Sequence, residues 1–176
     1  MKTSEEQSQS SPESDVVLRE ARMADYEGLC LLFAELDELH RVARPDIFVV
    51  PQGPRRTREY IEAQIGSETS TIFVAERAST LVGFAHVMRK EMIALPIRPA
   101  KVYAEVENLV VASAHRRSGI GLKLLGEAQS WACSRGIDVV HIGVFAFNCA
   151  AIALYKRAGF SIDTMRMSKR SLQGNS

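Results

Sequence analysis

Two spacings of hydrophobic residues run through the chain, and together they predict a mixture of strands and helices. Short apolar runs and alternating apolar and polar residues predict strands at 16–21, 71–77, 81–92, 102–111, 138–147 and 160–168. Apolar residues three and four positions apart predict helices at 25–39, 57–65, 120–135 and 148–158. The predicted order of elements is βααβββαβαβ.

Prolines and glycines mark where these elements end. Residues 44–54 are interrupted by prolines and must form a loop, and Gly136 and Gly159 close the two later helices. The strands at 71–77 and 81–92 are separated by a tight turn, so we expect them to pair antiparallel. The pattern as a whole predicts an α/β fold in which a central mixed sheet of about six to seven strands is flanked by about four helices.

The composition is that of one globular domain without a strong electrostatic field. The chain has 176 residues, 46% of them hydrophobic, which is enough to bury one substantial core. We expect a disordered leader at 1–15, where acids and serines dominate, a single domain at 16–170 and a flexible tail at 171–176. A formal net charge of +1 gives no general attraction to nucleic acid or to a membrane surface.

Cysteine and histidine usage indicates a cytoplasmic protein without a metal site. The three cysteines are odd in number, unrelated in spacing and placed in apolar segments, so we expect reduced, buried thiols. No residue run has the length of a membrane span, and the first residues lack the apolar core of a signal peptide. The four histidines show no metal-ligand spacing among themselves or with the cysteines.

The stretch HRRSGIGLKLL, at 115–125, joins a predicted strand directly to a predicted helix. Unpaired N–H groups and the positive end of the helix dipole meet there, and two glycines let the main chain curl around an oxyanion, which favours a phosphate site. The same six residues RRSGIG are equally compatible with a tight connection whose arginines are solvated. A Walker loop is excluded because Leu122 stands where lysine is needed, and Leu124 replaces the third glycine of a Rossmann fingerprint.

A second motif, NCAAIALYKRAGF at 148–160, again follows a strand and opens a helix. Together with RRSGIG it resembles the GNAT superfamily of acetyl-CoA-dependent N-acetyltransferases. Arg116, Gly119 and Gly121 meet the family pattern [Q/R]-x-x-G-x-[G/A], and the resemblance extends over about 16–168. It implies a GNAT-like sandwich in which the parallel strands 102–111 and 138–147 splay apart at one end.

This resemblance also implies where acetyl-CoA binds as co-substrate. The backbone of the strand before the glycine loop would line the pantetheine arm and thioester, through Leu109, Val110 and Val111. The glycine loop would hold the pyrophosphate, through Arg116, Arg117, Ser118, Gly119, Ile120, Gly121 and Leu122. Asn148 is expected to bond the arm from the opposite side.

Three residues are candidates for the chemistry of acetyl transfer. The resemblance implies that Tyr155 donates a proton to the leaving sulfur, although an aromatic residue on the inner face of a helix is also ordinary core. An alkyl amine with a pKa of about 10.4 is only about one part in a thousand neutral at pH 7.4, so a general base is useful. Glu105 and Glu107 occupy alternate positions on one strand and are candidates for that base, or else a solvated or substrate-binding stripe.

The acceptor is less constrained than the donor. We expect a primary amine of a small molecule or protein, drawn in by the acids Glu35, Asp37 and Glu38, although a solvent-exposed helix face explains those acids equally well. His86 and His141 either line the acceptor pocket or serve the structure. A non-catalytic acyl-CoA-binding or regulatory module of the same fold is the alternative function, and a homodimer is compatible with either one.

Overall fold

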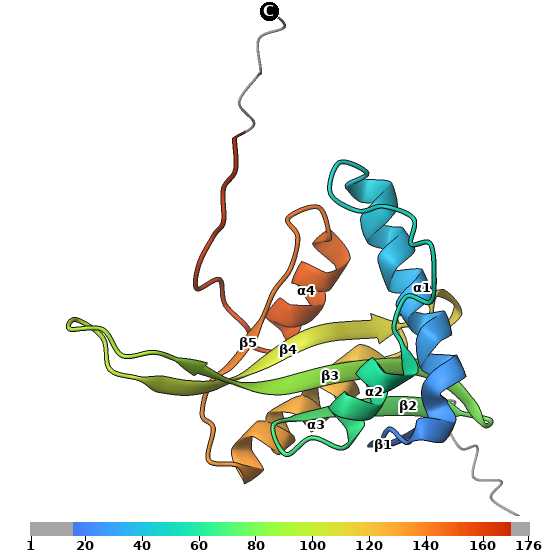
Figure 1. Ribbon diagram of the computed structural model, residues 1–176, viewed down its shortest axis with the longest axis horizontal. Helices are drawn as coiled ribbons and strands as arrows, with labels where there is room; N and C mark the ends of the chain where they lie inside the picture. The colour runs from blue at the N-terminus through green and yellow to red at the C-terminus, as the bar shows by residue number, and fades with distance from the viewer. Residues whose placement is uncertain (1–15, 170–176) are drawn as a thin grey trace, which may run out of the picture.

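A five-stranded mixed sheet lies at the centre of the molecule, with helices against both of its faces (Figure 1). The structure is a computed structural model that describes residues 16–169. The strands are β1 (Val17–Glu20), β2 (Ser70–Arg77), β3 (Thr80–Met92), β4 (Lys101–Val111) and β5 (Val140–Ile142). The helices are α1 (Tyr26–Ala43), α2 (Arg58–Ile65), α3 (Ile120–Ser134) and α4 (Cys149–Arg157), with 3-10 turns η2 (Met23–Asp25) and η3 (Ser113–His115).

The strands lie in the order in which they occur along the chain, from β1 to β5. Neighbouring strands are antiparallel except β4 and β5, which are parallel. The turn between β2 and β3 places Ala78 and Ser79 at φ values of 47° and 62°, the left-handed conformation that a tight hairpin needs. The predicted mixed α/β sandwich is therefore confirmed, with five strands in the described residues rather than six to seven.

The two strands predicted at the C-terminal end are where the sequence prediction was wrong. The strand predicted at 138–147 is reduced to Val140–Ile142, and residues 160–169 form no strand within the part of the chain that the structure describes. Residues 160–169 instead run away from the sheet, with Ile162, Met165 and Met167 exposed (Figure 1). Alternation identifies residues that could form a strand but does not supply a neighbouring strand. The predicted leader (1–15) and tail (171–176) lie outside the described residues.

Two separate hydrophobic cores hold the helices to the sheet. On one face, α1 and α2 bury Leu29, Leu32, Phe33 and Ile61 against β2 and β3. On the opposite face, the inner side of α3, including Trp131, packs on β3 and β4, with α4 at its edge. The helical spacing of apolar residues in α1 and α3 thus predicted which helix faces would be buried. The sheet between the two cores provides a rigid base for the residues at the ends of β4 and β5.

Candidate active site

A gap opens between β4 and β5 because the two strands pair over only a short length. Their parallel register runs from Ala104 opposite Val140 to Val106 opposite Ile142, where β5 ends. β4 continues to Val111, where β3 is its only neighbouring strand within residues 16–169. The splaying expected from the resemblance is therefore present in the fold.

The backbone polar groups of β4 face this gap at alternate residues. Ala112 N–H donates to the Val82 carbonyl on β3 at 2.9 Å. Since successive residues of a strand direct their N–H and C=O groups to opposite sides, those of Val111 and Leu109 point away from β3. Leu109 therefore offers both a donor and an acceptor to a chain lying where β5 would otherwise continue.

A β-bulge in β4 sets which side chains lie on each face of the sheet. The register with β3 shifts so that Val106 lies opposite Val87 and Asn108 opposite His86, which leaves Glu107 as the extra residue. Before the bulge, Val106 packs into the α3 core. After it, Leu109 packs into that core and Val110 into the α1 core. This bulge is local, and the alternation of residue types in 102–111 did not reveal it.

The loop between β4 and α3 presents a run of backbone donors. Within residues 16–169, the N–H groups of residues 117–121 donate to no backbone carbonyl. Arg117 and Gly119 have φ values of 68° and 82°, and these left-handed conformations curl the loop before α3 begins at Ile120. Five consecutive donors at the positive end of a helix dipole match the oxygens of a pyrophosphate.

The two arginines of this loop have different surroundings. Arg116 donates through Nε to the Val111 carbonyl at 3.0 Å and lies 3.7 Å from the Glu35 carboxylate. The same carboxylate accepts from the Ser113 N–H at 2.9 Å. Arg116 therefore ties the loop to β4 and α1. Arg117 is exposed and forms no ion pair within the described residues, so it is better placed than Arg116 to meet a phosphate.

The two glycines of the motif are needed for different reasons. Gly119 holds the left-handed conformation, which side chains with a Cβ adopt only with strain. At Gly121, an added Cβ would lie 2.8 Å from Cδ2 of Leu154 on α4. Gly121 therefore allows α3 and α4 to approach each other closely, which is a packing role that the motif alone did not reveal.

Helix α4 brings Asn148 and Tyr155 to the α3 side of the sheet. Asn148 caps the helix by accepting from the Ala151 N–H at 3.1 Å, and its side-chain NH2 remains available to donate. Tyr155 is half-buried beside the α3 core, and burial raises the pKa of its phenol to about 12. Its hydroxyl therefore stays protonated throughout the range of ordinary pH.

Glu105 and Glu107 differ in their environment although they lie close together. Glu107 forms an ion pair with Lys90 at 2.7 Å. Glu105 is half-buried and forms no hydrogen bond or ion pair within the residues described. Burial, and next the charge of Glu107, raise the pKa of Glu105 above its usual range. Of the two carboxylates, Glu105 has the better properties for a general base.

His86 and His141 have separate environments. His86 is buried between β3 and α2, where its Nε2 lies 2.9 Å from Ser70 Oγ and 3.2 Å from Gln64 Oε1. Burial lowers the pKa of His86 to about 4, so the ring is neutral at physiological pH. His141 lies opposite Glu105 in the parallel register, and its ring contacts that of Tyr103 at a centroid distance of 4.8 Å.

An aromatic cluster that the sequence analysis missed lies at the end of α1. His40 contacts the rings of Phe48, Phe145 and Phe147 at centroid distances between 5.2 and 5.9 Å. These residues come from α1, the loop after it and the segment that follows β5. Their separation along the chain left no local sequence signal for the cluster.

The acids of α1 are engaged with basic groups. Glu35 approaches Arg116, and Glu38 pairs with Arg41 one turn later on the same helix. Asp37 lies 3.5 Å from both Arg55 and Arg56. This pairing removes most of the reason to expect that these acids attract a cationic amine.

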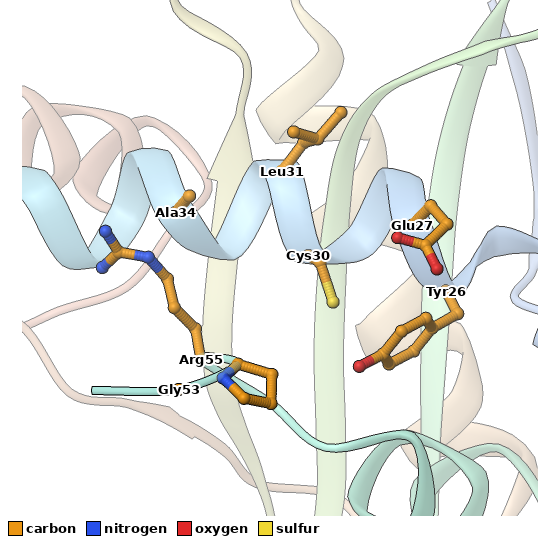
Figure 2. A pocket seen from close by; sticks show the side chains of 8 residues that line it. Tyr26, Glu27, Cys30, Leu31, Ala34, Gly53 and Arg55 are labelled. Carbon is orange, nitrogen blue, oxygen red and sulfur yellow. The ribbon is translucent and has the colours of Figure 1, made fainter. Parts of the chain in front are cut away.

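Another depression, of about 380 Å³, lies between α1 and residues 53–55 of the loop that follows it (Figure 2). Tyr26, Cys30 and Arg55 are among the residues that surround it, and none of its lining residues belongs to the gap or to the glycine loop. Tyr26 donates its hydroxyl to the Arg56 carbonyl at 2.9 Å, which holds the loop against α1. We place the candidate site at the gap because the unpaired backbone groups of β4 and of the glycine loop lie along it.

Two negative findings apply to residues 16–169. No group of three or more His, Cys, Asp or Glu side chains in this region is arranged to hold a metal ion. None of its helices combines the length and the apolar character required to cross a bilayer.

Comparison with known proteins supports the assignment of this fold. The model of the acetyltransferase (GNAT) family matches residues 14–160. A mutant of the BH1408 protein from Bacillus halodurans has a similar structure, with a TM-score of 0.84, 24% identity and coverage of 89% of this chain and 99% of that one. Glucosamine-6-phosphate N-acetyltransferase from Arabidopsis thaliana gives a TM-score of 0.64 at 20% identity, with coverage of 88% and 97%.

Curated relatives match over a shorter region. An uncharacterised N-acetyltransferase of Bacillus subtilis, YobR, is 36% identical over 59 residues, which is 34% of this chain and 24% of the relative. An uncharacterised protein of Mycobacterium leprae, ML0378, is 38% identical over 86 residues, or 49% and 21% of the two chains. The matched region is thus about a quarter of the length of these relatives or less.

Proposed function

Since the chain belongs to the acetyltransferase (GNAT) family, we propose that it transfers an acetyl group from acetyl-CoA to a primary amine of a small molecule or protein. Transfer would occur by direct attack of the amine while both substrates are bound. The observation that carries this proposal is the gap beside β4. It opens where β5 ends at Ile142 and extends to the loop whose five backbone N–H groups are free.

The two halves of acetyl-CoA find matching groups in this gap. The N–H groups of 117–121, with the Arg117 side chain, suit the pyrophosphate. The pantetheine arm contains amides, which suit the N–H of Val111 and the C=O of Leu109 in the manner of a strand added to β4. Asn148 donates to the arm from the other side. When bound, acetyl-CoA supplies an activated thioester carbonyl.

Glu105 acts as the general base. The attacking amine must lose its protons as its nitrogen forms a bond to the acetyl carbon, and Glu105 accepts one directly or through a water molecule. Its raised pKa brings it closer to the range in which a base is effective. The Leu109 N–H, directed into the gap, donates to the acetyl oxygen as negative charge develops there.

Tyr155 assists the departure of the sulfur when the carbon–sulfur bond breaks. A phenol with a pKa of about 12 is a weaker acid than a thiol, whose pKa is about 8.5 in cysteine. Complete proton transfer from Tyr155 to the thiolate is therefore uphill. We assign to its hydroxyl a hydrogen bond that stabilises the departing thiolate, which then takes its proton from solvent or from the protonated base.

The decisive experiment is an acceptor screen with the whole chain. Acetyl-CoA binding is measured first by calorimetry, and release of free thiol is then followed with a chemically diverse set of primary amines. We expect binding, and thiol release that depends on the amine for at least one acceptor. Binding without transfer to any amine would contradict the proposal and favour a non-catalytic acyl-CoA-binding module. The expected cytoplasmic location and homodimer remain predictions.

A further inference from the structure

The aromatic cluster at the end of α1 is linked to the proposed reaction centre by the segment that follows β5. β5 ends at Ile142, and its His141 lies opposite Glu105 in the parallel register. Phe145 and Phe147 follow in the segment after β5, so they lie only a few residues along the chain from the position beside Glu105. The contact between Phe145 and His40 of α1, at 5.4 Å between ring centroids, places both rings on the α1 face of the sheet.

Glu105 lies on that same face. It precedes the bulge at an odd position of β4, while its even-numbered neighbours Ala104 and Val106 pack into the opposite, α3 core. Beside it are the contacting rings of Tyr103 and His141. Two rings next to Glu105 thus lie on the same face of the sheet as the rings of the cluster.

The charge in this region matches a single ammonium group. The α1 acids Glu35, Asp37 and Glu38 each lie close to an arginine. Lys90 offsets the charge of Glu107. Glu105 is left as the one carboxylate of this group without an ion pair in the described residues, and it attracts one positive charge. A polycationic acceptor would leave its other ammonium groups unmatched.

We propose that the acceptor is a monoamine that carries an aromatic group, with its amine at Glu105 and its ring against Phe145 and Phe147. This inference rests on the proposed acetyltransferase function. Rings favour planar partners because offset and edge contacts add to the burial of apolar area. An amino sugar would instead require hydrogen-bonding side chains, and the four clustered residues His40, Phe48, Phe145 and Phe147 offer only one polar ring.

The test compares three acceptors with the full-length chain and saturating acetyl-CoA. They are 2-phenylethylamine, glucosamine and spermidine, and kcat/KM is measured for each by thiol release. We expect 2-phenylethylamine to exceed both others at least tenfold. If glucosamine or spermidine is acetylated as well or better, the inference is overturned while the acetyltransferase function stands. If no amine is acetylated, the function itself fails and the inference fails with it.

Substitutions within the cluster test whether its rings contact the aromatic group of the acceptor. Phe147→Ala should lower kcat/KM for 2-phenylethylamine about tenfold and leave the Kd for acetyl-CoA unchanged. Phe147 is 36% exposed, so the fold should tolerate the change, and the thermal midpoint Tm verifies this. Val144→Ala is the matched control, because Val144 is 43% exposed and belongs to no ring contact. Equal activity of Phe147→Ala and the unaltered protein towards 2-phenylethylamine would overturn the placement of the ring.

Discussion

The proposed cofactor side and the proposed acceptor side of the gap are built from different parts of the chain. The cofactor side uses mainly backbone groups, from Leu109 and from the loop at 117–121. The acceptor side uses side chains, with Glu105 from β4 and rings from α1, its following loop and the segment after β5. A backbone site needs only particular φ and ψ values, whereas a side-chain site depends on how distant segments pack together.

This difference predicts how each side responds to substitution. The cofactor side should tolerate many changes of side chain but not a change of backbone conformation. The acceptor side should tolerate small shifts of the backbone but not the loss of its one unpaired carboxylate. Four substitutions test this contrast.

Gly119→Val should have the largest effect, a loss of acetyl-CoA affinity of a hundredfold or more. A β-branched residue at a φ of 82° is strained. When the backbone relaxes to relieve this strain, the N–H groups of the loop no longer converge on the pyrophosphate. Calorimetric titration with acetyl-CoA measures the change. Gly126→Val is the matched control, since open space surrounds Gly126 on α3, the helix that follows the glycine loop. Unchanged affinity in Gly119→Val would reject the phosphate site.

Glu105→Gln should lower kcat/KM by about a hundredfold to a thousandfold, because a general base typically contributes that much. Because its pKa is raised, Glu105 becomes protonated at a higher pH than an ordinary glutamate, and kcat/KM of the unaltered protein should fall as the pH drops through that range. This fall should be absent from the profile of Glu105→Gln. Glu107→Gln, which removes the partner of Lys90, should change kcat/KM only a few-fold. Equal losses in both variants would refute the distinction between them.

The same Glu105 substitution should raise stability. A glutamate whose pKa is higher in the folded than in the unfolded chain binds protons more readily when folded, so its charge destabilises the fold once the pH exceeds the unfolded pKa. Glutamine removes that charge, and Tm at pH 7 should therefore increase. A variant that loses both activity and stability would indicate a structural role for Glu105.

Tyr155→Phe should lower kcat about tenfold to a hundredfold and leave the Kd for acetyl-CoA nearly unchanged. The ring still fills its place beside the α3 core, and only the hydrogen bond to the departing sulfur is lost. Single-turnover measurement of thiol release tests this prediction. Tyr60→Phe serves as the control, because Tyr60 is exposed on α2. A change of Kd with unaltered kcat would place Tyr155 in binding rather than in catalysis.

Gly121→Ala should have the smallest effect, a loss of about 1 to 3 kcal/mol in the free energy of unfolding, which is typical of overpacking. The added methyl group would meet Leu154 at 2.8 Å. Urea unfolding of Gly121→Ala, Leu154→Ala and the double variant measures the coupling between the two positions. If the double variant loses the full sum of the single losses, Gly121 and Leu154 do not compete for the same space.

The cofactor side was largely predictable from the sequence, because its signal is local. Two glycines between a strand and a helix identify a curled loop with free donors, and the resemblance adds the partner motif at 148–160. Even there, the sequence did not separate the conformational role of Gly119 from the packing role of Gly121. Local sequence also could not show that Arg116 binds the Val111 carbonyl and Glu35, since those contacts depend on where α1 lies.

The acceptor side was less predictable for the same physical reason. Alternation in 102–111 marked Glu105 and Glu107 as neighbours, but the Lys90 ion pair that separates their properties comes from another strand. The cluster around His40 requires three segments to meet in space. The strand expected at 160–168 shows a further limit, since a strand forms only where a neighbouring strand is available.

Amide hydrogen exchange measured by NMR, with and without acetyl-CoA, tests the central claim most directly. The claim is that the donor lies along the unpaired edge of β4 and on the glycine loop. Acetyl-CoA should slow exchange at Leu109 and at residues 117–121, relative to Ala104, whose N–H already donates to the Val139 carbonyl at 2.9 Å. Slowed exchange at other residues, with Leu109 and the loop unchanged, would contradict the account.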